Sequence, residues 1–113
     1  MTRGDIYLAD FPFGGSHGSK PRPALVLTGE LGPVPEVLAA YISSAVPAPL
    51  LPTDFVIDPN NPAQATTNIK AYSVVRLHKL ATLHRRRFYR QIGMMSPADM
   101  AEVERILRLL LGL

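Results

Sequence analysis

The placement of proline is the feature of this sequence that most limits its fold. The chain has 113 residues and 11 prolines, and ten of those prolines precede residue 63. Proline has no backbone donor, so it disrupts the interior of helices and of central strands. The first half of the chain therefore has room only for short extended segments between turns. The second half, with one proline, has room for longer elements.

Six segments have the composition of β-strands. They are rich in apolar, β-branched or aromatic residues and are bounded by glycine, proline or polar turns. We expect strands at 4–11, 22–28, 36–44, 53–59, 71–83 and 90–95. The stretch 22–28 is apolar without interruption after its arginine, which is typical of a strand buried on both faces. We expect a glycine-rich loop at 12–21, a polar loop at 60–68 and a turn or short helical piece at 84–90.

The segment that begins at Ser96 has the pattern of an amphipathic helix. Ser96 is a good N-cap, Pro97 suits the first helical position, and Asp99 lies where a capping box has an acid. Apolar residues follow three and four positions apart, at Met100, Val103, Ile106, Leu107 and Leu110. Gly112 is a suitable stop. We therefore expect one domain over 1–113, mainly β with a C-terminal α-helix, built as a curled antiparallel sheet or small barrel.

Cysteine and long apolar runs are both missing from the sequence. Without cysteine there is no disulfide framework and no thiolate metal site, so a reducing cytoplasm is the expected compartment. Asp5 lies where a signal peptide needs an apolar core, and no run approaches the ~20 residues of a membrane span. We expect no membrane partner.

The basic residues form one block. The net charge is +3, but residues 70–91 carry seven lysines and arginines and no acid. Such a block can bind nucleic acid by neutralising phosphates. It can equally be a solvated surface or a landing site for an acidic partner.

Motifs for metal, phosphate-loop or serine-hydrolase chemistry do not occur. The three histidines, at positions 17, 78 and 84, have no paired spacing for a metal. The GGSHGS loop has no GK[ST] ending, and Ser43 and Ser44 have no GxSxG context. We expect no metal and no cofactor. The loop is either a simple hairpin connection or a flap beside a binding groove, carrying His17 and Lys20.

Arg22 lies between Pro21 and Pro23, at the mouth of an expected strand. Both prolines fix φ, and each restricts the residue before it, so the backbone around this arginine is stiff. A fixed guanidinium suits a phosphate, because its planar fork donates two parallel hydrogen bonds. It would also stabilise charge that develops on phosphorus in a transition state. The alternative is a solvated cation or a surface ion pair worth less than ~1 kcal/mol.

Five segments then occur in an order and spacing that resemble one known family. Between Gly4 and Leu83 they are GDIYLADF, KPRPALVL, AYISS, LPTDFVID and SVVRLHKLATL. Together they resemble the MazF/PemK toxins of type II toxin–antitoxin modules. The resemblance implies an SH3-like, CcdB/MazF-type barrel, usually a homodimer, in the cytoplasm. Its implied partner is a cognate antitoxin, with which it forms a DNA-binding complex.

The resemblance also implies an activity. These toxins are mRNA interferases: sequence-specific, metal-independent endoribonucleases that cut single-stranded mRNA. The 2′-hydroxyl of the RNA attacks the adjacent phosphorus and leaves a 2′,3′-cyclic phosphate and a 5′-hydroxyl. The arginine that would stabilise the phosphorane falls on Arg22. The hydroxyl that would hold the scissile phosphate in line falls on Ser43.

Further RNA-binding residues are implied by the same resemblance. They are His17, Lys20, Ser44, Pro52, Thr53, His78 and Lys79. His78 is either a general acid or base, since a histidine titrates near neutrality, or a structural residue. The run 85–87 would extend the RNA groove or attract an acidic antitoxin tail. The GGSHGSK loop departs from the longer loop of many members.

Two other functions compete with this interpretation. One is a CcdB-like inhibitor of DNA gyrase with the same fold. Such inhibitors rely on an aromatic residue near the end of the helix, whereas this chain has no Trp and ends LLLGL. The other is a catalytically silent barrel that binds RNA or a protein partner.

Overall fold

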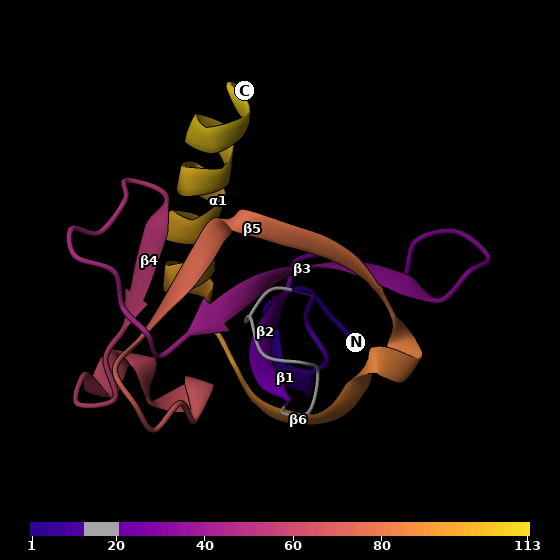
Figure 1. Ribbon diagram of the computed structural model, residues 1–113, viewed down its shortest axis with the longest axis horizontal. Coiled ribbons are helices and arrows are strands. Elements are labelled where there is room, and N and C mark those ends of the chain that lie inside the picture. Colours follow the sequence, from indigo (N-terminus) through magenta and orange to yellow (C-terminus); the bar gives the residue numbers. More distant parts are fainter. Residues whose placement is uncertain (13–20) are drawn as a thin grey trace.

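The structure is a computed structural model that describes residues 1–12 and 21–113 (Figure 1). The strands are β1 (Asp5–Ala9), β2 (Arg22–Val26), β3 (Glu36–Ser43), β4 (Asp54–Ile57), β5 (Ser73–His84) and β6 (Phe88–Met94). Two short 3₁₀ helices, η1 (Pro62–Thr67) and η2 (Arg85–Arg87), flank β5, and the helix α1 (Pro97–Leu111) follows β6. Each expected strand is present within a few residues of its expected bounds.

All six strands form one antiparallel sheet in the order β4-β5-β3-β2-β1-β6. The sheet is strongly curled, and β5 and β6 arch around β1 and β2 (Figure 1). In the described part of the chain β4 and β6 remain the two edges, so the curl does not close into a complete barrel. The expected mainly β domain with a C-terminal helix is confirmed.

The β3–β5 pairing contains an irregularity of three residues. Ala40 pairs with Leu80, but the next residue, Tyr41, pairs with Arg76. Residues 77–79 of β5 therefore have no partner opposite on β3. Such bulges bend a strand and redirect the side chains that it carries. Here the bulge lies near the middle of the longest strand, where β5 arches (Figure 1).

The core occupies both faces of the central strands. One cluster joins the sheet to α1 and includes Ile6, Leu25, Ile42, Val75, Leu77, Val103 and Ile106. A second cluster, on the other face, contains Ala9, Ala24, Ala39 and Leu83. The expectation that segment 22–28 is buried on both faces is confirmed within β2. Full burial of a single Leu, Ile or Val side chain is worth about 1.5–3 kcal/mol, so these two clusters dominate the stability of the sheet.

The helix α1 begins and ends where its sequence signals indicate. The Ser96 hydroxyl accepts a hydrogen bond from the Asp99 backbone N–H at 3.1 Å. Gly112 closes the helix in the left-handed conformation, with φ +73°. Val103 and Ile106 are buried, whereas Leu109, Leu111 and Leu113 are exposed at the end of the chain. No helix within the described ranges combines the length and apolar character that crossing a bilayer requires.

The expectation of a polar loop at 60–68 is wrong, because Pro62–Thr67 forms the 3₁₀ helix η1. Asn61 caps it by accepting a hydrogen bond from the Ala63 N–H at 3.0 Å. The segment lies against β6: the Thr66 hydroxyl donates to the Met94 carbonyl at 2.9 Å. A Cβ at Gly93 would collide with the backbone of η1, so only glycine fits where the two segments meet.

The segment 84–90 is only partly the turn or short helical piece that we expect. Its first part is a short helical piece, since the 3₁₀ helix η2 covers Arg85–Arg87, but β6 begins at Phe88. Pairing with β1 extends the strand backwards, because Ala9 pairs with Phe88 and Leu8 with Arg90. The strand that we expect at 90–95 therefore starts two residues earlier.

Candidate active site

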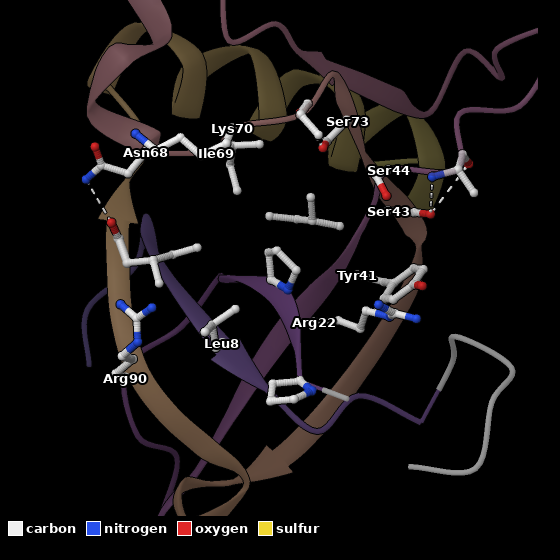
Figure 2. Close-up of a pocket in the computed structure, with 16 residues that line it drawn as sticks. Leu8, Arg22, Tyr41, Ser43, Ser44, Asn68, Ile69, Lys70, Ser73 and Arg90 are labelled. Atoms are coloured by element: carbon white, nitrogen blue, oxygen red, sulfur yellow. Dashed lines mark hydrogen bonds between the residues drawn. The ribbon is translucent and has the colours of Figure 1, made fainter. Parts of the chain in front are cut away.

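A cavity of about 750 Å³ opens at the end of the sheet where β2 begins and β3 ends (Figure 2). Its apolar lining is Leu8, Pro21, Pro23, Ile42, Ala45, Ile69, Ala71 and Ile92. Its other lining residues are Arg22, Tyr41, Ser43, Ser44, Asn68, Lys70, Ser73 and Arg90. None of the described residues that line it is acidic. The size is that of pockets that hold small ligands, and the charge favours an anion.

Strand register brings Arg22 and Ser43 to the same place. Ala24 on β2 pairs with Tyr41 on β3. Continued by two residues, this register puts Arg22 opposite Ser43. Residues directly opposite in an antiparallel pair point to the same face of a sheet. Figure 2 agrees, since the Arg22 side chain runs beside Tyr41 on the side of the cavity where Ser43 lies.

The Arg22 guanidinium has no carboxylate partner among the described residues. Five ion pairs occupy other arginines: Arg3–Glu104, Arg76–Asp54, Arg85–Glu30, Arg105–Glu102 and Arg108–Glu104. Arg22 itself is partly buried and flanked by the prolines that fix its backbone. A fixed, unneutralised guanidinium at the wall of a cavity is suited to bind an oxyanion.

Ser43 is oriented by the turn that follows β3. Its hydroxyl oxygen accepts a hydrogen bond from the Ala45 N–H at 3.1 Å. The contact of the same hydroxyl with the Ala45 carbonyl, at 3.5 Å, is at the limit of a hydrogen bond and is weak. The hydroxyl hydrogen is therefore available to donate to a ligand oxygen. Ser44, the next residue, is exposed and also lines the cavity.

His78 does not line the cavity. It is exposed on the β5 bulge, and its Nε2 lies 3.4 Å from Nη2 of Arg76. Arg76 in turn donates from Nε to the Asp54 carboxylate at 2.8 Å, and the Asp54 side chain is fully buried. His78 is thus the exposed end of a row of three interacting side chains, Asp54, Arg76 and His78.

The other residues expected to bind RNA are spread over two places. Pro52 and Thr53 precede β4, where the Thr53 carbonyl accepts the Leu77 N–H at 3.3 Å, and neither lines the cavity. Lys79 does not line it either, but its Nζ lies 5.8 Å from the ring centre of Tyr41, which does. His17 and Lys20 lie outside the described residues.

Five polar residues of the cavity were not among the expected site residues: Tyr41, Asn68, Lys70, Ser73 and Arg90. Arg90, on β6, lies across the cavity from Arg22 (Figure 2). Lys70 and Asn68 come from the segment between η1 and β5, where the Asn68 side chain donates to the Ile92 carbonyl at 2.8 Å. The basic block 70–91 contains the two cationic ones, Lys70 and Arg90, so its charge was the available signal for them. The sheet order that brings β6 next to β1 could not be read from the sequence.

Tyr89, the residue before Arg90 on β6, is hydrogen-bonded to the residue that follows β1. Tyr89 donates its hydroxyl hydrogen to the Asp10 carboxylate at 2.8 Å. This hydrogen bond is the main reason that the pKa of Tyr89 is raised above its usual value. Tyr89 therefore stays protonated at neutral pH.

No group of three His, Asp or Glu side chains in residues 1–12 and 21–113 is placed to hold a metal ion.

Known proteins resemble the chain over nearly its whole length. Residues 2–111 match the family described as PemK-like, MazF-like toxin of type II toxin-antitoxin system. The endoribonuclease MazF of Staphylococcus epidermidis is 30% identical over 116 residues, which cover 100% of this chain and 92% of that protein.

Solved structures have the same fold. The toxin MazF-mt6 of Mycobacterium tuberculosis superimposes with a TM-score of 0.74 at 23% identity, over 96% of this chain and 97% of that one. A mycobacterial endoribonuclease in complex with its cognate antitoxin gives 0.72 at 22% identity, over 100% and 96%. MazF from Deinococcus radiodurans gives 0.70 at 22% identity, over 100% and 97%. The resemblance noted in the sequence is confirmed, and the chain belongs to the PemK/MazF family of type II toxin–antitoxin toxins.

Proposed function

We propose that this toxin is an endoribonuclease that cuts single-stranded mRNA at specific sequences in the cytoplasm, without a metal. The observation that carries the proposal is the register between β2 and β3, which puts Arg22 opposite Ser43 at the wall of a cavity. That cavity has cationic residues and no acidic ones among its described lining. An RNA phosphate fits this charge, whereas a cationic substrate would need acidic residues in the lining.

The reaction needs no nucleophile from the protein. The 2′-oxygen of the RNA forms a bond to the adjacent phosphorus as the bond from phosphorus to the 5′-oxygen breaks. The 2′-hydroxyl loses a proton and the leaving 5′-oxygen gains one, which yields a 2′,3′-cyclic phosphate and a 5′-hydroxyl. Arg22 stabilises the extra negative charge on the phosphorane, and Ser43 donates a hydrogen bond to a phosphate oxygen.

The proline pair on either side of Arg22 has a role in this scheme. A long side chain that must be ordered at the transition state loses conformational entropy at that moment. With Pro21 and Pro23 fixing the backbone, part of this cost is met during folding. The guanidinium then faces the developing charge without a large rearrangement, which is the requirement for electrostatic catalysis.

The far side of the cavity contributes binding. Arg90 and Lys70 are exposed and lie in the same cavity as Arg22. We assign them to phosphates that flank the scissile one, because a single strand that crosses the cavity presents a charge at every nucleotide. His78 either transfers a proton in the reaction or helps to hold the Arg76 side chain in place.

The proposed protein partners are a cognate antitoxin and a second copy of the toxin. The antitoxin is supported by the family and by the related mycobacterial complex. Leu109, Leu111 and Leu113 at the end of α1 are exposed, which leaves apolar surface for a second copy to cover.

The test is incubation of purified protein with a long single-stranded RNA in EDTA, followed by analysis of the 3′ ends of the fragments. We expect discrete cuts that end in cyclic phosphate, and loss of these cuts with Arg22→Ala. Arg108→Ala is the matched control, because Arg108 lies on the exposed side of α1 and pairs with Glu104. Cleavage by a folded Arg22→Ala protein would contradict the role of this arginine. Intact RNA that still binds the wild-type protein would favour the silent barrel instead.

A further inference from the structure

The bulge in β5 brings a lysine to the side of an aromatic residue of the cavity. Of its three residues, Leu77 is buried, His78 is exposed and Lys79 is partly buried. The bulge lies opposite the step from Ala40 to Tyr41. A regular strand would have matched each of these residues with a neighbour on β3. The irregular register instead leaves Lys79 to extend over the ring of Tyr41.

Tyr41 is held from more than one side. Its ring centre lies 5.4 Å from that of Phe11, at a tilt of 36°, and 5.8 Å from Nζ of Lys79. An ammonium within about 6 Å of a ring centre is attracted by the negative face of the ring. Tyr41 is only 7% exposed, so its ring is a rigid platform for this cation. A lysine side chain is otherwise flexible and costly to order.

Tyr41 also lies beside both residues of the proposed reaction centre. It is two positions before Ser43 on β3, and it pairs with Ala24, two positions after Arg22. Residues two apart on a strand share a face, so the three side chains lie on one face of the sheet. Figure 2 shows the ring of Tyr41 beside the Arg22 side chain. Because the Lys79 ammonium lies 5.8 Å from the centre of this ring, it is close to the place where the scissile phosphate is proposed to bind.

We infer that Tyr41 is a positioning residue that holds the Lys79 ammonium next to the path of the RNA, where Lys79 neutralises a phosphate adjacent to the scissile one. The inference rests on the proposed function and adds a residue to it. Tyr41 acts through the face of its ring, which phenylalanine also offers and leucine does not. Its effect on RNA therefore passes through Lys79 and depends on salt.

The experiment is a double-mutant cycle on RNA binding. The probe is a single-stranded oligonucleotide of mixed sequence in which every sugar is 2′-deoxy, so that the wild-type protein binds it without cleaving. Dissociation constants are measured at several salt concentrations for the wild type, Tyr41→Phe, Tyr41→Leu, Lys79→Met and the Tyr41→Leu/Lys79→Met pair. One lost phosphate contact changes the slope of log K against log salt by about 0.7 for single strands.

We expect Lys79→Met to reduce the slope by about 0.7, which corresponds to a loss of about fivefold in affinity at 0.1 M salt relative to 1 M. Tyr41→Leu should give the same loss, the double variant should lose no more than Lys79→Met, and Tyr41→Phe should keep the wild-type slope. Losses that add in the double variant would overturn the inference, because independent sites add and coupled ones do not. A wild-type slope in Tyr41→Leu would overturn it too, and a full loss in Tyr41→Phe would assign the effect to the hydroxyl.

Two further measurements keep the outcome decisive. If Tyr41→Leu does not fold, the ring-current shift of the Lys79 methylene protons in the wild-type protein replaces it. An unshifted lysine would show that the ring does not hold it. Cleavage of the all-ribose oligonucleotide by the wild type is scored separately. Its absence, with binding and the salt slopes intact, would overturn the enzymatic function and leave the inference about Tyr41 standing. Absence of RNA binding would overturn both.

Discussion

Arg22 and Arg76 are two arginines in neighbouring parts of the same sheet, and their surroundings are opposite. Arg76 is neutralised: its Nε donates to Asp54, whose side chain is fully buried and whose other oxygen accepts the Leu51 N–H. Arg22 has no carboxylate partner in the described part of the chain and is instead constrained by two prolines. The charge of Arg76 is neutralised by Asp54, and this ion pair belongs to the fold. Arg22 has a backbone fixed by prolines and no carboxylate partner among the described residues, which leaves its charge for a ligand.

The largest effect that we expect concerns the neutralised arginine. Asp54→Ala leaves the Arg76 charge partly buried and unpaired, which should lower the free energy of unfolding by about 3–5 kcal/mol. Urea unfolding measures this loss. The cleavage rate of the protein that remains folded should change little, because Asp54 does not line the cavity.

A control for this variant replaces both partners, as Asp54→Leu/Arg76→Met. It should recover much of the lost stability, since it leaves no unpaired charge. If Asp54→Ala and the wild type unfold at the same urea concentration, the ion pair does not stabilise the fold. The contrast between Arg76 and Arg22 is then wrong for Arg76.

The next effect concerns Arg22. Arg22→Ala should lower the cleavage rate by about 10²–10³-fold, as expected when one donor to a developing oxyanion is removed. Its urea midpoint should stay near that of the wild type, because no ion pair is lost. Arg22→Lys keeps the charge but not the planar fork, so its cleavage rate should lie between those of the wild type and Arg22→Ala. A rate for Arg22→Lys equal to the wild type would show that only charge is required there.

The smallest effect concerns Arg90, the second arginine of the cavity. Arg90→Ala should weaken binding of a single-stranded RNA by about fivefold at 0.1 M salt and reduce the salt slope by about 0.7, as one phosphate contact does. Arg86→Ala is the matched comparison, because Arg86 is an exposed arginine of the same basic block that does not line the cavity. Equal losses in both variants would mean that the whole block, and not the cavity, attracts the RNA.

The sequence predicted which segments form strands and the helix far better than it predicted which strands lie next to each other in the sheet. Strand existence and the bounds of α1 follow from local signals: the apolar stretches between turns, Ser96 as cap and Gly112 as stop. Asn61 and Pro62 carry the same kind of start signal as Ser96 and Pro97. Because η1 is short, no apolar period follows to distinguish it from a loop, and we expected a loop there.

The site was predictable only in part. The stiff backbone at Arg22 was visible in the sequence, but its position opposite Ser43 depends on register, and the role of each residue came from family resemblance. The bulge at 77–79 was not predicted, although the alternation of apolar and polar residues breaks there, where Lys79 follows His78. The roles of these residues, and of His78, stay predictions.

The pairing of β1 with β6 has a consequence for the time at which the toxin becomes complete. These two strands come from opposite ends of the chain, and β6 supplies Arg90 and Ile92 to the cavity. A ribosome that makes the protein releases β1, β2 and β3 long before β6 emerges. Until then the cavity lacks one wall, even with Arg22 and Ser43 already outside the exit tunnel. The nascent toxin is thus incomplete while its own message is being translated, and the order of the strands sets that delay.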